Sequence, residues 1–175
     1  MSETEYAESD EADAGDAEAV GQSSQNAGPS MGDIFNRTDT KNEIKIGVVF
    51  FALVGLGLGL GAFVAQALES DFEFLAMELL SFGLILPSLV AVIIAQRQSN
   101  ALGDLPDNLA FGTAGVTALA GTLVLGLVLW LFGEMIDEFG DLGDLLLPLV
   151  GLGIGAAAVS VGMIWVMRNL IEDDD

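Results

Sequence analysis

The chain has 175 residues, 52% of them hydrophobic, and it carries 26 acidic residues against 5 basic ones, for a net charge of −21. It contains no histidine and no cysteine, which excludes disulfide frameworks, thiolate nucleophiles and the metal sites that these side chains build. The negative charge also argues against nucleic acid as a partner, because nucleic acids are bound by basic patches.

Residues 1–45 are predicted to form a disordered acidic tail with a basic end. In residues 1–33, nine acidic residues are separated by Ala, Ser, Gly and Gln, without the periodicity of a helix or a strand. Such a composition buries too little apolar surface to offset the entropy lost on ordering. The last part of the tail carries Arg37, Lys41 and Lys45, just before the first apolar block.

Four apolar blocks follow the tail, and each is long enough to cross a bilayer, which takes about 20 residues. They are uncharged apart from Glu78 near the start of the second, and they cover residues 46–68, 75–95, 109–132 and 145–167. Solid apolar blocks favour helices over the alternating segments of a transmembrane barrel. The sequence therefore predicts an all-α fold: an integral membrane four-helix bundle over residues 46–168, followed by an acidic tail at 169–175.

The basic residues predict the orientation of this bundle. If the chain crosses the membrane four times, all five fall on one side: Arg37, Lys41, Lys45, Arg97 and Arg168. The two hairpins on the other side carry acidic residues only. Because basic residues beside membrane helices stay in the cytoplasm, we expect a multi-pass protein of the cell membrane with both termini cytoplasmic.

Small residues recur at a spacing of four, which places them on one face of a helix. Such faces let membrane helices approach closely. The predicted helix-packing residues are Gly55, Gly57, Gly59, Gly61, Thr117, Gly121, Gly151, Gly155 and Gly162. Three interpretations stay open: packing within one chain, contact with a second copy or a partner, and the lining of a cofactor site or ion path.

Two glycine-rich segments resemble one another. Residues 53–62 and 149–158 are identical at seven of ten positions. The first and fourth predicted helices run in opposite directions, so the likeness is compatible with an inverted repeat of the transporter kind. No matching similarity links the second and third helices, and low-complexity Gly/Leu sequence produces such matches by chance, so duplication stays an open alternative.

Polar residues near the acidic hairpins form a candidate cation or solute site, since oxygen ligands suit Na⁺, Mg²⁺ and Ca²⁺. The candidate residues are Glu78, Gln66, Asp137, Asp141 and Asp144. Two simpler interpretations compete with this site. Glu78 lies close enough to a helix end to reach water, and acidic loops are also expected of a protein exposed to molar salt.

The acidic, cysteine-free composition, rich in Ala, Gly, Val and Leu, resembles that of small multi-pass membrane proteins of halophilic archaea. The resemblance is compositional and transfers no functional residue. We expect no catalytic residue, resident metal or cofactor. The favoured function is a non-enzymatic structural or accessory subunit that acts through helix–helix contacts, with membrane lipid and a second copy or another membrane protein as partners. The alternative is a small transporter or channel, whose polar path would need Thr113, Thr117, Thr122, Ser88 and Ser160.

Overall fold

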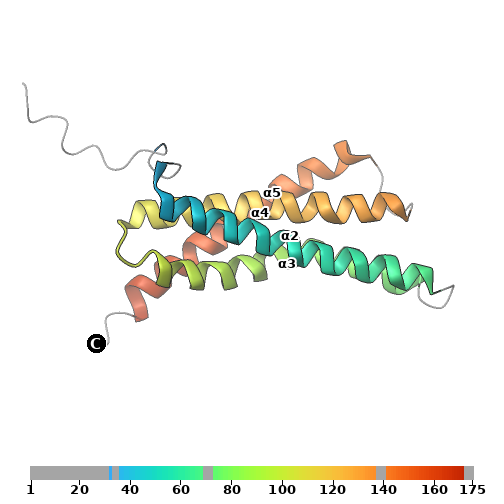
Figure 1. The fold of residues 1–175 in the computed structure, drawn as a ribbon, viewed down its shortest axis with the longest axis horizontal. Helices are drawn as coiled ribbons and strands as arrows, with labels where there is room; N and C mark the ends of the chain where they lie inside the picture. The colour runs from blue at the N-terminus through green and yellow to red at the C-terminus, as the bar shows by residue number, and fades with distance from the viewer. Residues whose placement is uncertain (1–31, 33–35, 69–72, 137–140, 172–175) are drawn as a thin grey trace, which may run out of the picture.

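The structure is a computed structural model that describes residue 32 and residues 36–68, 73–136 and 141–171. Within these ranges the chain forms four long α-helices and no strand. The elements are α2 (Thr38–Ala67), α3 (Glu73–Ala101), α4 (Asp107–Met135), α5 (Leu142–Val166) and a π-helical turn, η1 (Met167–Ile171), which continues α5 (Figure 1). All four helices contain stretches long and apolar enough to cross a membrane, which confirms an all-helical fold with four apolar helices.

The helices extend beyond the predicted apolar blocks. Residues 38–45, assigned above to the tail, form the first turns of α2, and α3 continues from the predicted end at 95 to Ala101. Apolar length measures the hydrocarbon thickness, whereas the backbone hydrogen bonds of a helix can continue into water. The residues of the predicted tail before position 36, apart from residue 32, and residues 172–175 lie outside the described residues.

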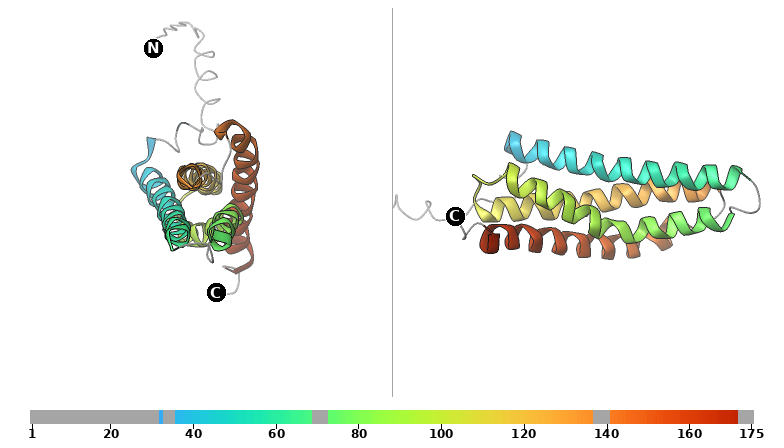
Figure 2. Two further views of the ribbon diagram at one scale, coloured as in Figure 1. Left: turned by 90° about the vertical axis from the view of Figure 1, so that its right-hand side faces the viewer. Right: turned by 90° about the horizontal axis from the view of Figure 1, so that it is seen from below.

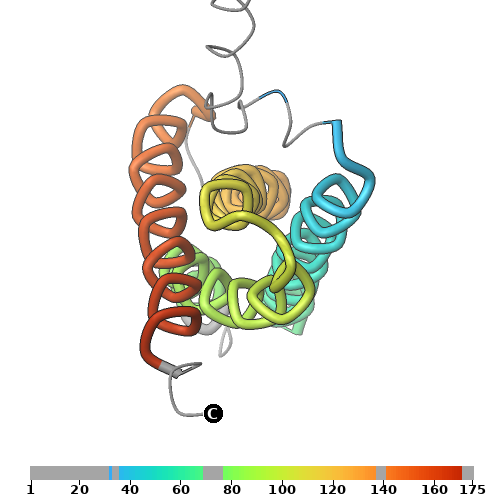
Figure 3. Tube along the Cα trace, turned by 90° about the vertical axis from the view of Figure 1, so that its left-hand side faces the viewer, coloured from blue at the N-terminus to red at the C-terminus, as the bar shows by residue number. Residues whose placement is uncertain are grey.

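Neighbouring helices in the chain run antiparallel, and α4 lies within the curve formed by the other three (Figures 2 and 3). It contacts α2, α3 and α5, whereas α2 and α5 do not contact one another over the described residues. The packing order around the bundle is therefore α2, α3, α5, α4. The apolar stretch of α4 is accordingly the most buried of the four, at 39%, and that of α5 the least, at 22%.

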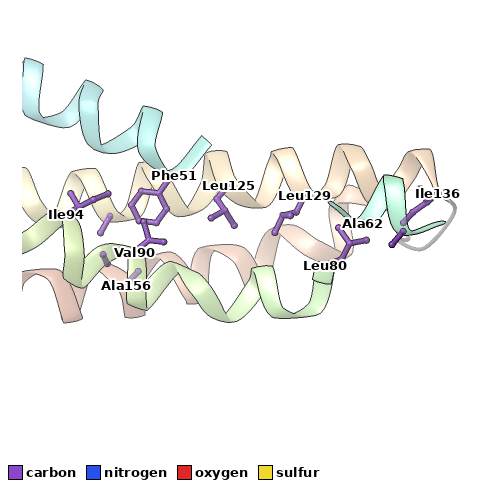
Figure 4. Close-up of a cluster of buried hydrophobic side chains, with 12 residues drawn as sticks. Phe51, Ala62, Leu80, Val90, Ile94, Leu125, Leu129, Ile136 and Ala156 are labelled. Carbon is purple, nitrogen blue, oxygen red and sulfur yellow. The ribbon is translucent and has the colours of Figure 1, made fainter. Parts of the chain in front are cut away.

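The main core runs along the middle of the bundle (Figure 4). Its largest fully buried side chains come from three helices: Phe51 of α2, Leu80 of α3, and Leu125 and Leu129 of α4. The buried residue that α5 contributes is the small Ala156. A second cluster lies where the end of α3, the start of α4 and the end of α5 meet. It contains Ala95, Leu102, Ala110, Ala114 and Ile164.

Candidate functional site

Three of the predicted packing glycines lie where two helices approach closely. A Cβ atom at Gly55 of α2 would stand 3.3 Å from the carbonyl oxygen of Leu125 on α4, and a Cβ at Gly59 would overlap the ring of Phe132. Gly121 of α4 lies beneath the fully buried ring of Phe51, which would overlap a Cβ there. These glycines pack helices α2 and α4 together within one chain.

Four further glycines, which were not in the predicted packing set, also lie at close approaches, and one of their partners is the predicted Thr117. A Cβ at each of these glycines would overlap one side chain of a neighbouring helix, and the pairs are Gly47 with Thr117, Gly83 with Leu129, Gly126 with Leu149, and Gly153 with Leu119. In each pair one side chain, a leucine in three cases and Thr117 in the fourth, fills the space above a single glycine. The spacing of small residues along one helix gives no signal for such a pair, because the partner belongs to another helix.

The remaining glycines of the predicted packing set make no close approach to another helix. A Cβ at Gly57, Gly151, Gly155 or Gly162 would meet no atom within 4 Å, and all four residues are exposed. A Cβ at Gly61 would stand 3.5 Å from a methyl group of Leu79, which is an ordinary contact. The spacing rule thus identified small faces but not the direction in which each one points.

Three of these four predicted but open glycines lie together on α5. Gly151, Gly155 and Gly162, with the exposed Ala158, follow one side of the helix at a spacing of three or four residues. Large exposed side chains border this side, and they are Leu147 at 81% exposure, Ile154 at 60% and Trp165 at 50%. We call these seven residues the outer α5 face. It is a shallow strip of exposed backbone beside protruding apolar side chains.

Three buried hydroxyl groups of α4 form hydrogen bonds within that helix. Thr113, Thr117 and Thr122 are fully buried, and each hydroxyl donates a hydrogen bond of 2.7 Å to the carbonyl four residues earlier. Gln98 of α3 donates from Nε2 to Thr117 Oγ1 at 3.0 Å. Its Oε1 and the buried Ser160 hydroxyl have no hydrogen-bond partner among the described residues. Because each threonine hydroxyl already donates its proton to a carbonyl oxygen of α4, it has no proton left to donate to a transported solute.

The residues of the candidate cation or solute site do not form a cluster in the described part of the chain. Gln66 Nε2 donates to the backbone oxygen of Ile136 at the end of α4, at 3.4 Å, beside a hollow of about 160 Å³. Glu78, Asp141 and Asp144 are exposed, and Asp137 lies outside the described residues. No group of three or more acidic residues that could hold a metal ion occurs in the described ranges.

The opposite end of the bundle gathers the five basic residues, because they flank the start of α2 and the ends of α3 and α5 (Figure 1). Two of them form ion pairs of very different character. Arg168 has a side chain only 9% exposed, which donates to Asp107 at 2.5 Å and to the backbone oxygens of Leu102 at 2.5 Å and Leu105 at 3.0 Å. Arg97 pairs with Glu43 at 3.2 Å and is 52% exposed.

Arg168 therefore holds the end of α5 against the connection between α3 and α4. The sequence indicated only a basic residue beside an apolar helix, and no local pattern identified the carbonyl groups that it binds.

Comparison of the chain with known protein families, curated protein sequences and solved structures finds no match.

Proposed function

We propose that the protein is a non-enzymatic accessory subunit of a membrane assembly, and that its outer α5 face binds a transmembrane helix of a partner. The observation that carries this proposal is the open strip of Gly151, Gly155 and Gly162. In water a glycine inside a helix costs about 1 kcal/mol relative to alanine. Three such residues on one exposed face bring no packing benefit within the chain.

A glycine strip gains its benefit when a second helix lies against it. Lipid tails are as apolar as leucine, so membrane helices associate through close packing, and glycines allow their backbones to approach. The protruding Leu147, Ile154 and Trp165 would pack beside the partner helix and enlarge the contact. The back-bonded threonines of α4 favour this packing role over a polar path for a solute.

The test is affinity purification from membranes in a mild detergent at high salt, followed by mass determination of the complex. We expect a stoichiometric partner with the wild-type chain and its loss with Gly155→Leu. Gly57→Leu is the matched control, because Gly57 is equally open but lies on α2, and this variant should keep the partner. A complex that persists in Gly155→Leu, or a wild-type chain that is always monomeric, would contradict the proposal. A second copy bound through α5 would identify the partner helix as the chain's own.

We further propose that the basic end of the bundle faces the cytoplasm, as the distribution of Lys and Arg favours. The chain contains no cysteine, so single cysteines report accessibility without background. In intact cells, a membrane-impermeant maleimide should label Glu134→Cys at the acidic end and leave Asp104→Cys at the basic end unlabelled. Both positions are exposed. The reverse labelling would mean the opposite orientation.

A further inference from the structure

A groove runs between α2 and α3 near the basic end of the bundle and has a volume of about 70 Å³. Its floor is at Gly47, and the Thr117 methyl group occupies the position that a Cβ of residue 47 would take. Its walls are large apolar side chains that also face outward: Ile46 at 41% exposure, Phe50 at 42% and Ile93 at 57%.

The mouth of the groove is the ion pair between Glu43 and Arg97. Arg97 Nη2 donates to the Glu43 carboxylate at 3.2 Å, and the half-exposed guanidinium carries further N–H donors. The Glu43 side chain is only 13% exposed, so the guanidinium of Arg97 is the more accessible of the two charges. The groove is thus apolar along its walls and has a pair of opposite charges at one end, next to the point where the apolar blocks of α2 and α3 end.

We propose that this groove binds one zwitterionic phospholipid, with an acyl chain between the walls and the headgroup on the ion pair. A guanidinium matches the oxygens of a phosphate through paired hydrogen bonds. The ammonium group of the same headgroup would face Glu43. Such a lipid satisfies both charges, whereas a purely anionic headgroup would meet the carboxylate of Glu43 as well as Arg97.

The shape of the groove favours a lipid over a helix. Close helix packing in membranes needs several small residues along one face, whereas Gly47 is the one small residue among the seven described residues that line this groove. A narrow hollow with protruding walls fits a flexible chain. In a bilayer no water fills an apolar hollow at this position, so a chain segment that enters it gains dispersion contacts with the walls.

This inference rests on the membrane placement of the proposed function but not on the partner at α5. The test is native mass spectrometry of the delipidated full chain in detergent micelles, with phosphatidylethanolamine added back. We expect one tightly bound lipid per wild-type chain. Ile93→Trp, which fills the groove, and Arg97→Gln, which removes the guanidinium, should each weaken binding at least tenfold.

Two matched variants control for the general effect of these changes. Ile85→Trp adds the same side chain as Ile93→Trp at another position of α3, where Ile85 is 67% exposed. Lys41→Gln removes an exposed positive charge. Neither Ile85 nor Lys41 lines the groove. Both should bind the lipid as the wild type does, and so should Gly155→Leu, even if the α5 partner is lost. Equal binding by all variants would overturn the proposal. So would displacement of the lipid by inorganic phosphate, because the acyl chain would then contribute nothing.

Discussion

The two glycine-rich segments at residues 53–62 and 149–158 are nearly the same sequence and face opposite ways. Gly59 of the first segment lies beneath the ring of Phe132, whereas the equivalent Gly155 meets no atom within 4 Å. Their neighbours reverse the pattern: Gly57 is open, and its equivalent Gly153 lies against Leu119 of α4.

The leucines at the start of the two segments show the same reversal. Leu53 is 59% exposed, whereas the equivalent Leu149 is 1% exposed and fills the space above Gly126 of α4. A similar local sequence therefore does not decide which face of an apolar helix turns inward. That choice depends on the side chains that neighbouring helices offer, and the sequence likeness between the two segments does not extend to their packing.

The largest expected effect comes from a leucine placed at the two equivalent glycines. Gly59→Leu should lower the free energy of unfolding by about 3 kcal/mol, because overpacking a closely packed site forces neighbouring groups to shift. Gly155→Leu should change it by no more than about 0.5 kcal/mol, as expected for a surface position. The measurement is denaturant unfolding in micelles at dilute, monomeric concentration, followed by tryptophan fluorescence.

The other pair of equivalent glycines provides the control, with the order reversed. Gly153→Leu should destabilise the chain and Gly57→Leu should not. The loss at Gly153 should be smaller than at Gly59, about 1 to 2 kcal/mol, because the obstructing atom is the movable Leu119 Cδ1, 2.8 Å from the Cβ position. If Gly59→Leu does not fold, Gly59→Ala provides the same comparison at lower cost. Equal losses at Gly59 and Gly155 would mean that both segments turn the same face inward.

The sequence predicted the four helices well because apolar length is a local property. Blocks of more than 20 residues with at most one charge predict helices long enough to cross a bilayer, and each block coincides with one observed helix to within one residue at its C-terminal end or ends inside it. The helix ends were less predictable, since α2 begins at Thr38 although its apolar block begins at 46. The composition of the chain changes where the apolar block ends, whereas the helix continues past that point.

The sequence could not predict which face of each helix turns toward the core, and the reason is physical. In a soluble helix, polar residues mark the side that faces water, but a membrane helix is apolar on both sides. Spacing therefore placed Gly55 and Gly155 in one set, although one packs against α4 and the other is open. Long-range contacts were equally inaccessible, and the hydrogen bond from Gln98 to Thr117 is an example. Each depends on how two helices are aligned.

A substitution at Arg168 tests what sets the inward face of α5, because this side chain attaches one end of the helix to the α3–α4 connection. Its guanidinium binds Asp107 and three backbone oxygens of the α3–α4 connection, and a helix held at its end keeps its inner and outer faces in place. Arg168→Met retains the apolar stem and should cost about 2 kcal/mol, as expected when a mostly buried charged donor is removed. Arg97→Met, at an exposed pair, should cost less than about 1 kcal/mol in the same unfolding measurement. Equal costs would show that Arg168 does not clamp α5, and packing of side chains such as Leu149 would then have to set its rotation alone.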